Sequence, residues 1–406
     1  MNAIIAQSGG PTSVINSSLA GAISAFIENS FDHIYLSLNG IEGIISGNYR
    51  EVDKDSFIRD KISEKLLARP SSILGSCRFK LSNDMDDENY KQIFQTLEDL
   101  EIISLVYIGG NDSMDTVMKL NSYMDCHDIS GINVVGCPKT IDNDLCQMDH
   151  SPGFGSAAKF INHSLLTLRT DVDIYNLKSV TFVEIMGRNA GWLAASSLLS
   201  NHQAGKDVVN LLYLPEDNKS LDEVIEEIKK ALESENNLIV ALAEGFRDRE
   251  RLLDKPMFSN TDDGFNHKIV AGVGERLADI IRNELEIKSR SVELSLLQRT
   301  NTTISKTDAK EAYELGYNAA KLSKDKTNLI PILVREDADQ YKVTYTEVRP
   351  EKIANLEKKI PQDWIKDKNI LQEKIVNYAL PLIEGEVNQK YKNGLPVFVR
   401  LDDFIL

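Results

Sequence analysis

The sequence predicts an α/β protein of two three-layer lobes with mostly parallel sheets, followed by a C-terminal extension. Two observations indicate this class. Short apolar runs rich in β-branched residues alternate with amphipathic helical segments, and several of these runs end in glycine-rich turns. The chain of 406 residues is also too long for one ordinary hydrophobic core. We place one lobe at 1–152, completed by about 300–335, a second at 153–299, and the extension at 336–406.

The composition limits the partners and the compartment. A formal net charge of −16 without a basic tract argues against a nucleic-acid partner. The four cysteines show neither metal-ligand spacing nor a disulfide framework, which is typical of a reduced, intracellular chain. No apolar run approaches membrane-spanning length, and the N-terminus carries no signal-peptide pattern. We therefore expect a cytoplasmic protein with no membrane partner.

The first predicted elements are a buried strand at 3–6, a Gly9-Gly10 turn and a helix from Thr12 or Ser13. The free backbone N–H groups at such a helix start can cradle an anion. The Gly-x4-Gly-Lys-[Ser/Thr] spacing of a P-loop is absent, so a simple tight turn is the alternative.

Two apolar strands, at 104–108 and 132–136, are each followed by a polar turn. Because ligands bind beyond the carboxyl ends of parallel strands, we expect these turns to meet at one edge of a sheet. Asn111, Asp112 and Ser113 in the first turn can supply oxygen ligands to Mg²⁺.

The second of these turns contains two aspartates. Asp142 and Asp144, which follow Thr140, can supply a general base and a partner that orients it. The alternative is an Asx cap that serves only the turn. Phosphoryl transfer needs such a base together with a metal ion and cations for the developing charge. Arginines that can clamp phosphates in bidentate fashion are Arg78, Arg188, Arg290 and Arg299, although Arg78 taken alone is also consistent with a surface residue.

The second lobe repeats the alternation of strand, turn and helix. Gly153 and Gly155 match a dinucleotide-binding motif only in part, because no strand leads into them, and we interpret them as a hinge between the lobes. The tail from about Pro350 is charged and predicts an appended helical segment without a chemical motif. The remaining predicted elements are strands near 180–185, 211–216 and 238–243, a turn at 262–265 before a helix, an alternating strand at 290–299 and a last apolar strand at 328–334.

Several short motifs occur in the order found in the phosphofructokinase family, and the chain resembles that family over roughly its first three-quarters. The resemblance implies two Rossmann-like lobes and a phosphotransferase activity. It also implies a homodimer or homotetramer, because part of the family's sugar-phosphate clamp comes from a neighbouring subunit. The motifs are Gly9-Gly10-Pro11 with Asn16, Gly75-Ser76-Cys77-Arg78, Gly109-Gly110-Asn111-Asp112-Ser113, Pro138-Lys139-Thr140-Ile141-Asp142-Asn143-Asp144, Met186-Gly187-Arg188, Glu244-Gly245 and Gln298-Arg299.

The resemblance implies a role for each matching position. Asp142 is similar to the base that takes the proton from the sugar 1-hydroxyl, with Thr140 and Asp144 beside it. Arg78 is similar to the arginine that steadies the transferring phosphoryl group. The implied contacts to fructose 6-phosphate come from Thr140, Asp142, Met186, Gly187, Arg188, Glu244, Arg290 and Arg299. The implied donor contacts come from Gly10, Gly110, Asn111, Asp112, Ser113 and Lys139, with Asp112 and Asn111 as ligands of Mg²⁺.

Asp112 and Lys139 indicate the phosphoryl donor. ATP-using relatives carry glycine at both positions, and the pair in this chain resembles the pyrophosphate-dependent branch of the family. A carboxylate at Asp112 would lie where the α-phosphate of ATP lies. Two like charges ~4 Å apart at an effective dielectric constant of ~20 repel by about 4 kcal/mol, which is roughly a thousandfold in affinity. Lys139 would supply a compact positive charge to the departing phosphate, so we expect pyrophosphate as the donor.

Three positions depart from the family pattern. Asn111 stands where many relatives have aspartate, so Mg²⁺ would depend more on Asp112 and on pyrophosphate oxygens. Leu296 occupies a position that is commonly histidine or tyrosine near the sugar phosphate. Ser179 replaces a common interface arginine, with Lys178 one residue earlier as either a substitute or an exposed lysine.

The resemblance therefore implies Mg²⁺-dependent, reversible phosphoryl transfer from pyrophosphate to the 1-hydroxyl of fructose 6-phosphate, in glycolysis and gluconeogenesis. The alternatives are an ATP-dependent enzyme of the same family and a non-catalytic regulatory subunit that binds sugar phosphates. The intact set of Thr140, Asp142, Asp144 and Arg188 argues against the regulatory subunit. A dinucleotide-dependent oxidoreductase lacks its sequence fingerprint.

Overall fold

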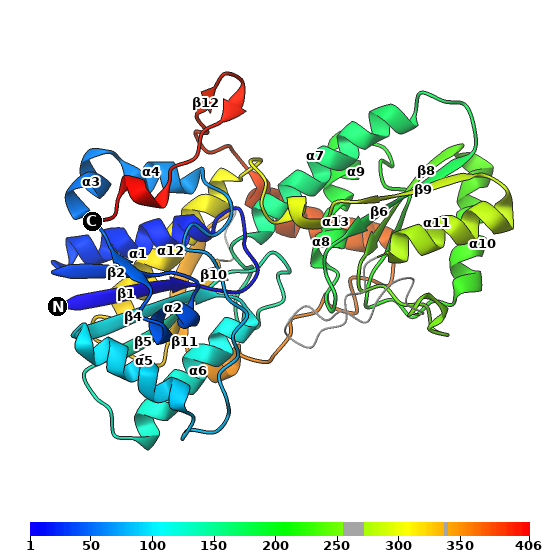
Figure 1. Ribbon diagram of the computed structural model, residues 1–406. Helices are drawn as coiled ribbons and strands as arrows, with labels where there is room; N and C mark the ends of the chain where they lie inside the picture. The colour runs from blue at the N-terminus through cyan, green and yellow to red at the C-terminus, as the bar shows by residue number, and fades with distance from the viewer. Residues whose placement is uncertain (255–271, 337–339) are drawn as a thin grey trace.

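The computed structural model describes residues 1–254, 272–336 and 340–406. The chain forms two α/β lobes, each built on its own sheet, and the C-terminal part of the chain passes between them (Figure 1). The predicted fold class is confirmed. Among the described residues, no helix combines the length and the apolar character that crossing a bilayer would require.

The strands of the first sheet are β1 (Asn2–Gln7), β2 (His33–Ser37), β3 (Tyr49–Glu51), β4 (Ile102–Gly109) and β5 (Asn133–Pro138). They lie in the order β3-β2-β1-β4-β5, and all neighbours are parallel except β2 and β3. From β1 the chain continues to β2, towards one edge of the sheet, and from β4 it continues to β5, towards the other edge. The loops after these two strands therefore open into one crevice, as expected at a topological switch point.

Helices cover both faces of this sheet, which is why every residue of β1 is buried. The helices α1 (Ile15–Glu28) and α12 (Lys306–Leu322) cover one face, and α5 (Glu88–Asp99) and α6 (Asn111–Cys126) cover the other (Figure 1). The backbones of α1 and α12 are in contact. A Cβ atom on Gly21 would lie 2.0 Å from the carbonyl oxygen of Tyr313, so only glycine fits at this crossing. The short helices of this lobe are α2 (Ile41–Ile45), α3 (Lys54–Arg59) and α4 (Ile62–Leu67).

The second sheet is fully parallel, in the order β7-β8-β6-β9. Its strands are β6 (Ser179–Ile185), β7 (Leu211–Tyr213), β8 (Asn237–Ala243) and β9 (Lys288–Glu293). One face packs against α7 (Phe154–Val172), α8 (Trp192–Ser196), α9 (Leu198–Ala204) and α13 (Lys368–Ala379). The other face packs against α10 (Leu221–Ser234), which begins with a capping box at Ser220, and α11 (Val273–Leu285).

The alternating strand predicted at 290–299 is wrong in its second half. The extended backbone ends at Glu293, and Ser295 adopts a φ of +44°, which starts the 3₁₀ helix η2 (Ser295–Gln298). As a result Leu296 is 56% exposed instead of facing the core. The side chain of Gln298 turns inward, and its Oε1 accepts a 3.0 Å hydrogen bond from the backbone N–H of Met186. The turn predicted at 262–265 lies outside the described residues.

The C-terminal part of the chain contains more than the helical segment that its composition predicts. The strands β10 (Ile330–Arg335) and β11 (Val343–Val348) form an antiparallel pair, so the apolar strand predicted at 328–334 is not the last strand. Beyond α13, β12 (Tyr391–Lys392) and β13 (Leu395–Pro396) form a hairpin that projects at the top of Figure 1. The chain then returns to the first lobe, where Phe404 packs at 6.1 Å from the ring of Phe57.

Candidate active site

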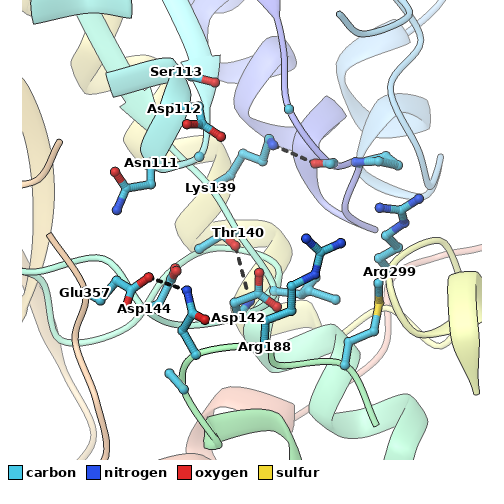
Figure 2. Close-up of a pocket in the computed structure, with 18 of the residues that line it drawn as sticks. Asn111, Asp112, Ser113, Lys139, Thr140, Asp142, Asp144, Arg188, Arg299 and Glu357 are labelled. Carbon is cyan, nitrogen blue, oxygen red and sulfur yellow. Dashed lines mark hydrogen bonds between the residues drawn. The ribbon is translucent and has the colours of Figure 1, made fainter. Parts of the chain in front are cut away.

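A cavity of about 450 Å³ lies between the two lobes, beyond the carboxyl ends of β1, β4, β5, β6 and β8. Most of the predicted site residues line this cavity. They are Gly10, Arg78, Gly110, Asn111, Asp112, Ser113, Lys139, Thr140, Asp142, Asp144, Met186, Arg188, Glu244 and Arg299. Figure 2 shows Asn111, Asp112 and Ser113 on one side of Lys139, with Asp142, Arg188 and Arg299 on the other.

The turn after β1 and the start of α6 form the donor side of the cavity. The Oγ atoms of Ser8 and Ser113 lie 2.6 Å apart and join these two segments. Gly109 is required at the end of β4, since a Cβ atom there would lie 1.9 Å from the Oγ of Ser113. Gly9 adopts a φ of +74°, which glycine allows at little cost. These close approaches leave the N-terminal turn of α6 facing the cavity, where its backbone dipoles favour anions.

Lys139 joins the turn after β1 and the end of β4 to the turn after β5. Its backbone N–H donates to the carbonyl of Gly109 at 2.9 Å, and its Nζ donates to the carbonyl of Gly10 at 2.6 Å. The side chain is only 1% exposed. Burial, with a smaller contribution from the positive charge of Arg299, lowers the pKa of Lys139 to about 7.

The turn with the two aspartates is held in place by side-chain hydrogen bonds. The backbone N–H of Asp142 donates to the Oγ1 of Thr140 at 3.2 Å. Asn143 has a φ of +57°, and its Oδ1 accepts from the backbone N–H of Ser151 at 2.9 Å. Burial raises the pKa of Asp142. Burial, and then the charge of Asp142, raise the pKa of Asp144 to about 7.

The second lobe contributes a cation and a carboxylate that face Asp142. The Nε of Arg188 lies 3.6 Å from the Oε1 of Glu244. The two loops that carry them are in backbone contact, since a Cβ atom on Gly245 would lie 1.9 Å from the carbonyl oxygen of Arg188. Burial, and then the charge of Asp142, raise the pKa of Glu244 to about 7. The site therefore sets partly buried carboxylates against clustered arginines and can bind an anionic ligand that carries a hydroxyl group.

Two predicted residues do not line the cavity. Arg290 lies on β9, where its Nε is buried without a hydrogen-bond partner among the described residues. Gly187 adopts a φ of +130° and lies next to Ala190, whose carbonyl oxygen would be 2.7 Å from an added Cβ atom, so it shapes the loop. Of the other departures noted in the sequence, Ser179 is buried and binds the side chain of Asn237 at 2.7 Å, and Lys178 is exposed.

Sequence reasoning missed four polar residues of the cavity lining, Lys80, Asn189, Asn355 and Glu357. Lys80 comes two residues after Arg78, and its position next to a recognised motif was a usable signal. Asn355 and Glu357 belong to the tail in which the sequence shows no chemical motif, and the structure places both in the cavity lining. No local sequence pattern predicts Asn355 and Glu357 as site residues, because only the path of the chain brings them to the cavity.

The donor side fits Mg²⁺ through Asp112 rather than Asn111. The amide group of Asn111 is already engaged, since its Oδ1 accepts from the backbone N–H of Asn355 and its Nδ2 donates to the carbonyl of Leu356, each at 2.6 Å. Within the described part of the chain no cluster of three or more histidine, cysteine or acidic side chains could hold a metal ion. Mg²⁺ does not need such a cluster, because it commonly binds through one carboxylate, water and substrate phosphates.

Comparisons with known proteins agree with this geometry. The family model described as phosphofructokinase matches residues 2–323. A pyrophosphate–fructose 6-phosphate 1-phosphotransferase from Halomonas elongata is 33% identical over 98% of this chain and 96% of its own. A sulfofructose kinase from Alkalicoccus urumqiensis is 33% identical over 92% of this chain and 94% of its own. The crystal structure of a pyrophosphate-dependent phosphofructokinase from Nitrosospira multiformis matches with a TM-score of 0.86 at 29% identity, covering 100% of this chain and 97% of that one.

Proposed function

The chain belongs to the phosphofructokinase family, and on that premise we propose that it transfers a phosphoryl group from pyrophosphate to the 1-hydroxyl of fructose 6-phosphate. The products are fructose 1,6-bisphosphate and inorganic phosphate. The observation that carries the proposal is the joining of two half-sites in one cavity. Asp112 and the buried cation Lys139 line the donor side, and Asp142 and Arg188 line the acceptor side.

Asp142 acts as the general base in this proposal. The 1-hydroxyl oxygen attacks the terminal phosphorus of pyrophosphate while its proton passes to the Asp142 carboxylate. The bridging P–O bond then breaks, and phosphate leaves from the side of Lys139. The raised pKa of Asp142 suits this role, because a base is most effective when its pKa approaches the working pH. Lys139 and Arg78 stabilise the charge that develops on the phosphoryl oxygens.

Asp112 would hold Mg²⁺, which would supply positive charge to the donor's phosphate groups. The acceptor would be held by Met186, Arg188, Glu244 and Arg299. Because the anhydride donor and the phosphate-ester product are close in free energy, the reaction runs in both directions and serves glycolysis or gluconeogenesis in the cytoplasm.

Arg290 supports a homodimer or homotetramer in this proposal. It lies on β9, outside the cavity of its own subunit, and the chain that follows exposes Leu296 and Leu297 at 56% and 63%. A second copy packed on this surface would receive Arg290 in its own site. Mixing inactive Arg290→Ala and Asp142→Ala subunits should restore activity if the sites are shared. No recovery after demonstrated subunit exchange would contradict sharing.

The direct test is product formation from fructose 6-phosphate with pyrophosphate and with ATP at equal concentration, each with and without Mg²⁺. We expect turnover with pyrophosphate and Mg²⁺ only. Turnover with ATP but not with pyrophosphate would agree with the assigned base and contradict the assigned donor. Sulfofructose, the acceptor in one relative's name, is compared in parallel. A preference for sulfofructose over fructose 6-phosphate would overturn the acceptor assignment.

A further inference from the structure

One short segment of the extension contacts three of the loops that build the cavity, those after β4, β5 and β6. We call residues 355–360 the tie segment. It lies across the cavity from the second lobe to α6, and two of its side chains, Asn355 and Glu357, line the cavity. Both are exposed rather than packed in a hydrophobic core. Because these two side chains bury little surface, they add little to the hydrophobic stabilisation of the fold.

On the donor side the tie segment fixes the first turn of α6. Asn111 exchanges two hydrogen bonds of 2.6 Å with the backbone of Asn355 and Leu356. The side-chain Nδ2 of Asn355 donates to the Oδ1 of Asp115 at 2.9 Å, one turn further along α6. Asn355 makes both contacts from a backbone with a φ of +61°. Asp112 lies inside this clamped turn.

In the middle the tie segment holds the turn that carries the base. The backbone N–H of Lys358 donates to the carbonyl of Asp144 at 2.6 Å. Its Nζ donates to the carbonyl of Asp149 at 2.7 Å and lies 5.2 Å from the ring centroid of Trp192. The position of Asp144 relative to the second lobe is therefore set through Lys358.

On the acceptor side the tie segment holds the loop that follows β6. The carboxylate of Glu357 accepts a hydrogen bond from the Nδ2 of Asn189, the residue after Arg188 (Figure 2). The indole N–H of Trp192 donates to the carbonyl of Lys358 at 2.9 Å. Glu216 reinforces the contact, since its Oε1 accepts from the backbone N–H of Gly191 at 3.0 Å and of Ile360 at 3.3 Å.

We propose that the tie segment sets the distance between the donor loop and the acceptor loop, with Asn355 and Glu357 as positioning residues for phosphoryl transfer. This rests on the proposed function. The two loops belong to separate sheets, so their relative position depends on contacts that span the lobes. Transfer rates respond steeply to such positions, and a misplacement of about 1 Å can cost on the order of a hundredfold.

The test compares Asn355→Gly, Glu357→Ala, their combination, and Glu351→Ala as a matched control. Glu351 is exposed in the same extension, outside the cavity lining. Asn355→Gly keeps the positive φ and the backbone N–H and removes only the bond to Asp115. We expect a several-fold rise in the KM for pyrophosphate with Asn355→Gly and in the KM for fructose 6-phosphate with Glu357→Ala. In the combination, kcat should fall by roughly ten- to a hundredfold. Glu357→Gln, which keeps an acceptor oxygen for Asn189, should restore the KM.

Hydrogen exchange on the full-length variants separates this proposal from the proposed function, because it needs no turnover. Asn355→Gly should speed amide exchange at 111–115, and Glu357→Ala should speed it at 187–191, with Glu351→Ala unchanged. If the wild-type protein has no pyrophosphate activity while amide exchange responds in this way, the proposed function is wrong but the tie segment still holds the two loops. Unchanged amide exchange in both variants would show that the tie segment does not hold these loops. Faster exchange in an active enzyme with unchanged KM and kcat overturns its positioning role.

Discussion

The Nζ of Lys139 donates a 2.6 Å hydrogen bond to the backbone carbonyl of Gly10, and this bond joins the turn after β5 to the turn after β1. Among the described residues, Lys139 forms no salt bridge with a carboxylate. Burial lowers its pKa to about 7, so at pH 8 the side chain is mostly neutral while the cavity holds no anion. A bound polyanion restores the charge, because it compensates the desolvation of the ammonium group.

Pyrophosphate binding at pH 8 should therefore be accompanied by uptake of most of one proton by Lys139. The measurement is calorimetry in two buffers with different ionisation enthalpies. Lys139→Met serves as the control, since the ligand's own protonation contributes equally in both proteins. Equal proton uptake by wild type and Lys139→Met would refute the assignment of the proton to Lys139.

Replacing the base should separate catalysis from folding. Asp142→Asn should lower kcat by roughly 10²- to 10⁴-fold, since general base catalysis contributes about that much. Its Tm at pH 8 should stay equal to that of wild type or rise, because burial disfavours the charged carboxylate. Rates and thermal unfolding are measured on the same preparation. Turnover near the wild-type level would remove Asp142 as the base and revive the regulatory-subunit alternative.

The stability effect of Asp144 should depend on pH in a defined window. Burial and the charge of Asp142 raise its pKa from 3.8 to about 7, so the folded state loses stability as the pH rises through that range. Asp144→Asn mimics the protonated form. Its Tm should match that of wild type near pH 4, exceed it increasingly up to pH 7, and then hold a constant lead. The gain is at most about 4 kcal/mol, reduced by water that reaches the side chain. A constant difference at all pH values would contradict the shift.

The donor preference should follow the charges at two positions. Asp112→Gly with Lys139→Gly should weaken pyrophosphate use and permit ATP turnover, because it removes a repulsion of about 4 kcal/mol, or roughly a thousandfold in affinity. Initial rates with both donors are compared for wild type, each single variant and the pair. A pair that merely loses pyrophosphate activity would show that the discrimination lies elsewhere in the cavity.

Gly153 should tolerate no side chain at the start of α7. It has a φ of +110°, and a Cβ atom would lie 2.7 Å from the Cγ2 of Thr12. Gly153→Ala should cost about 3 kcal/mol, seen as a lower Tm. Gly205→Ala is the matched control, since Gly205 has a φ of +62° with nothing within 4 Å of the added atom, and backbone strain alone costs about 1 kcal/mol. Equal losses would mean that the contact with Thr12 relaxes without cost.

The sequence was sufficient for the parts of the site that follow directly from strands. Asp112, Lys139 and Asp142 each lie within a few residues of a strand's carboxyl end, so local pattern and the geometry of parallel sheets predict that they meet. Asn355 and Glu357 have no such relation to a strand, and only the tertiary path brings them to the cavity. The prediction of a strand over 290–299 was wrong in its second half for a related reason. Alternating apolar residues favour an extended backbone, but the inward turn of Gln298 towards Met186 requires the chain to bend.

The contact between α1 and α12 has a consequence for how the protein is made. At the ribosome, α1 emerges early, yet the helix that covers it follows the entire second sheet in the sequence. During that interval the face around Gly21, which ends up against the backbone of α12, stays uncovered in the nascent chain. Long-range contacts of this kind slow folding and expose apolar surface to aggregation. The first lobe therefore completes its core only after most of the second has been translated, and chaperone demand should be highest in that interval.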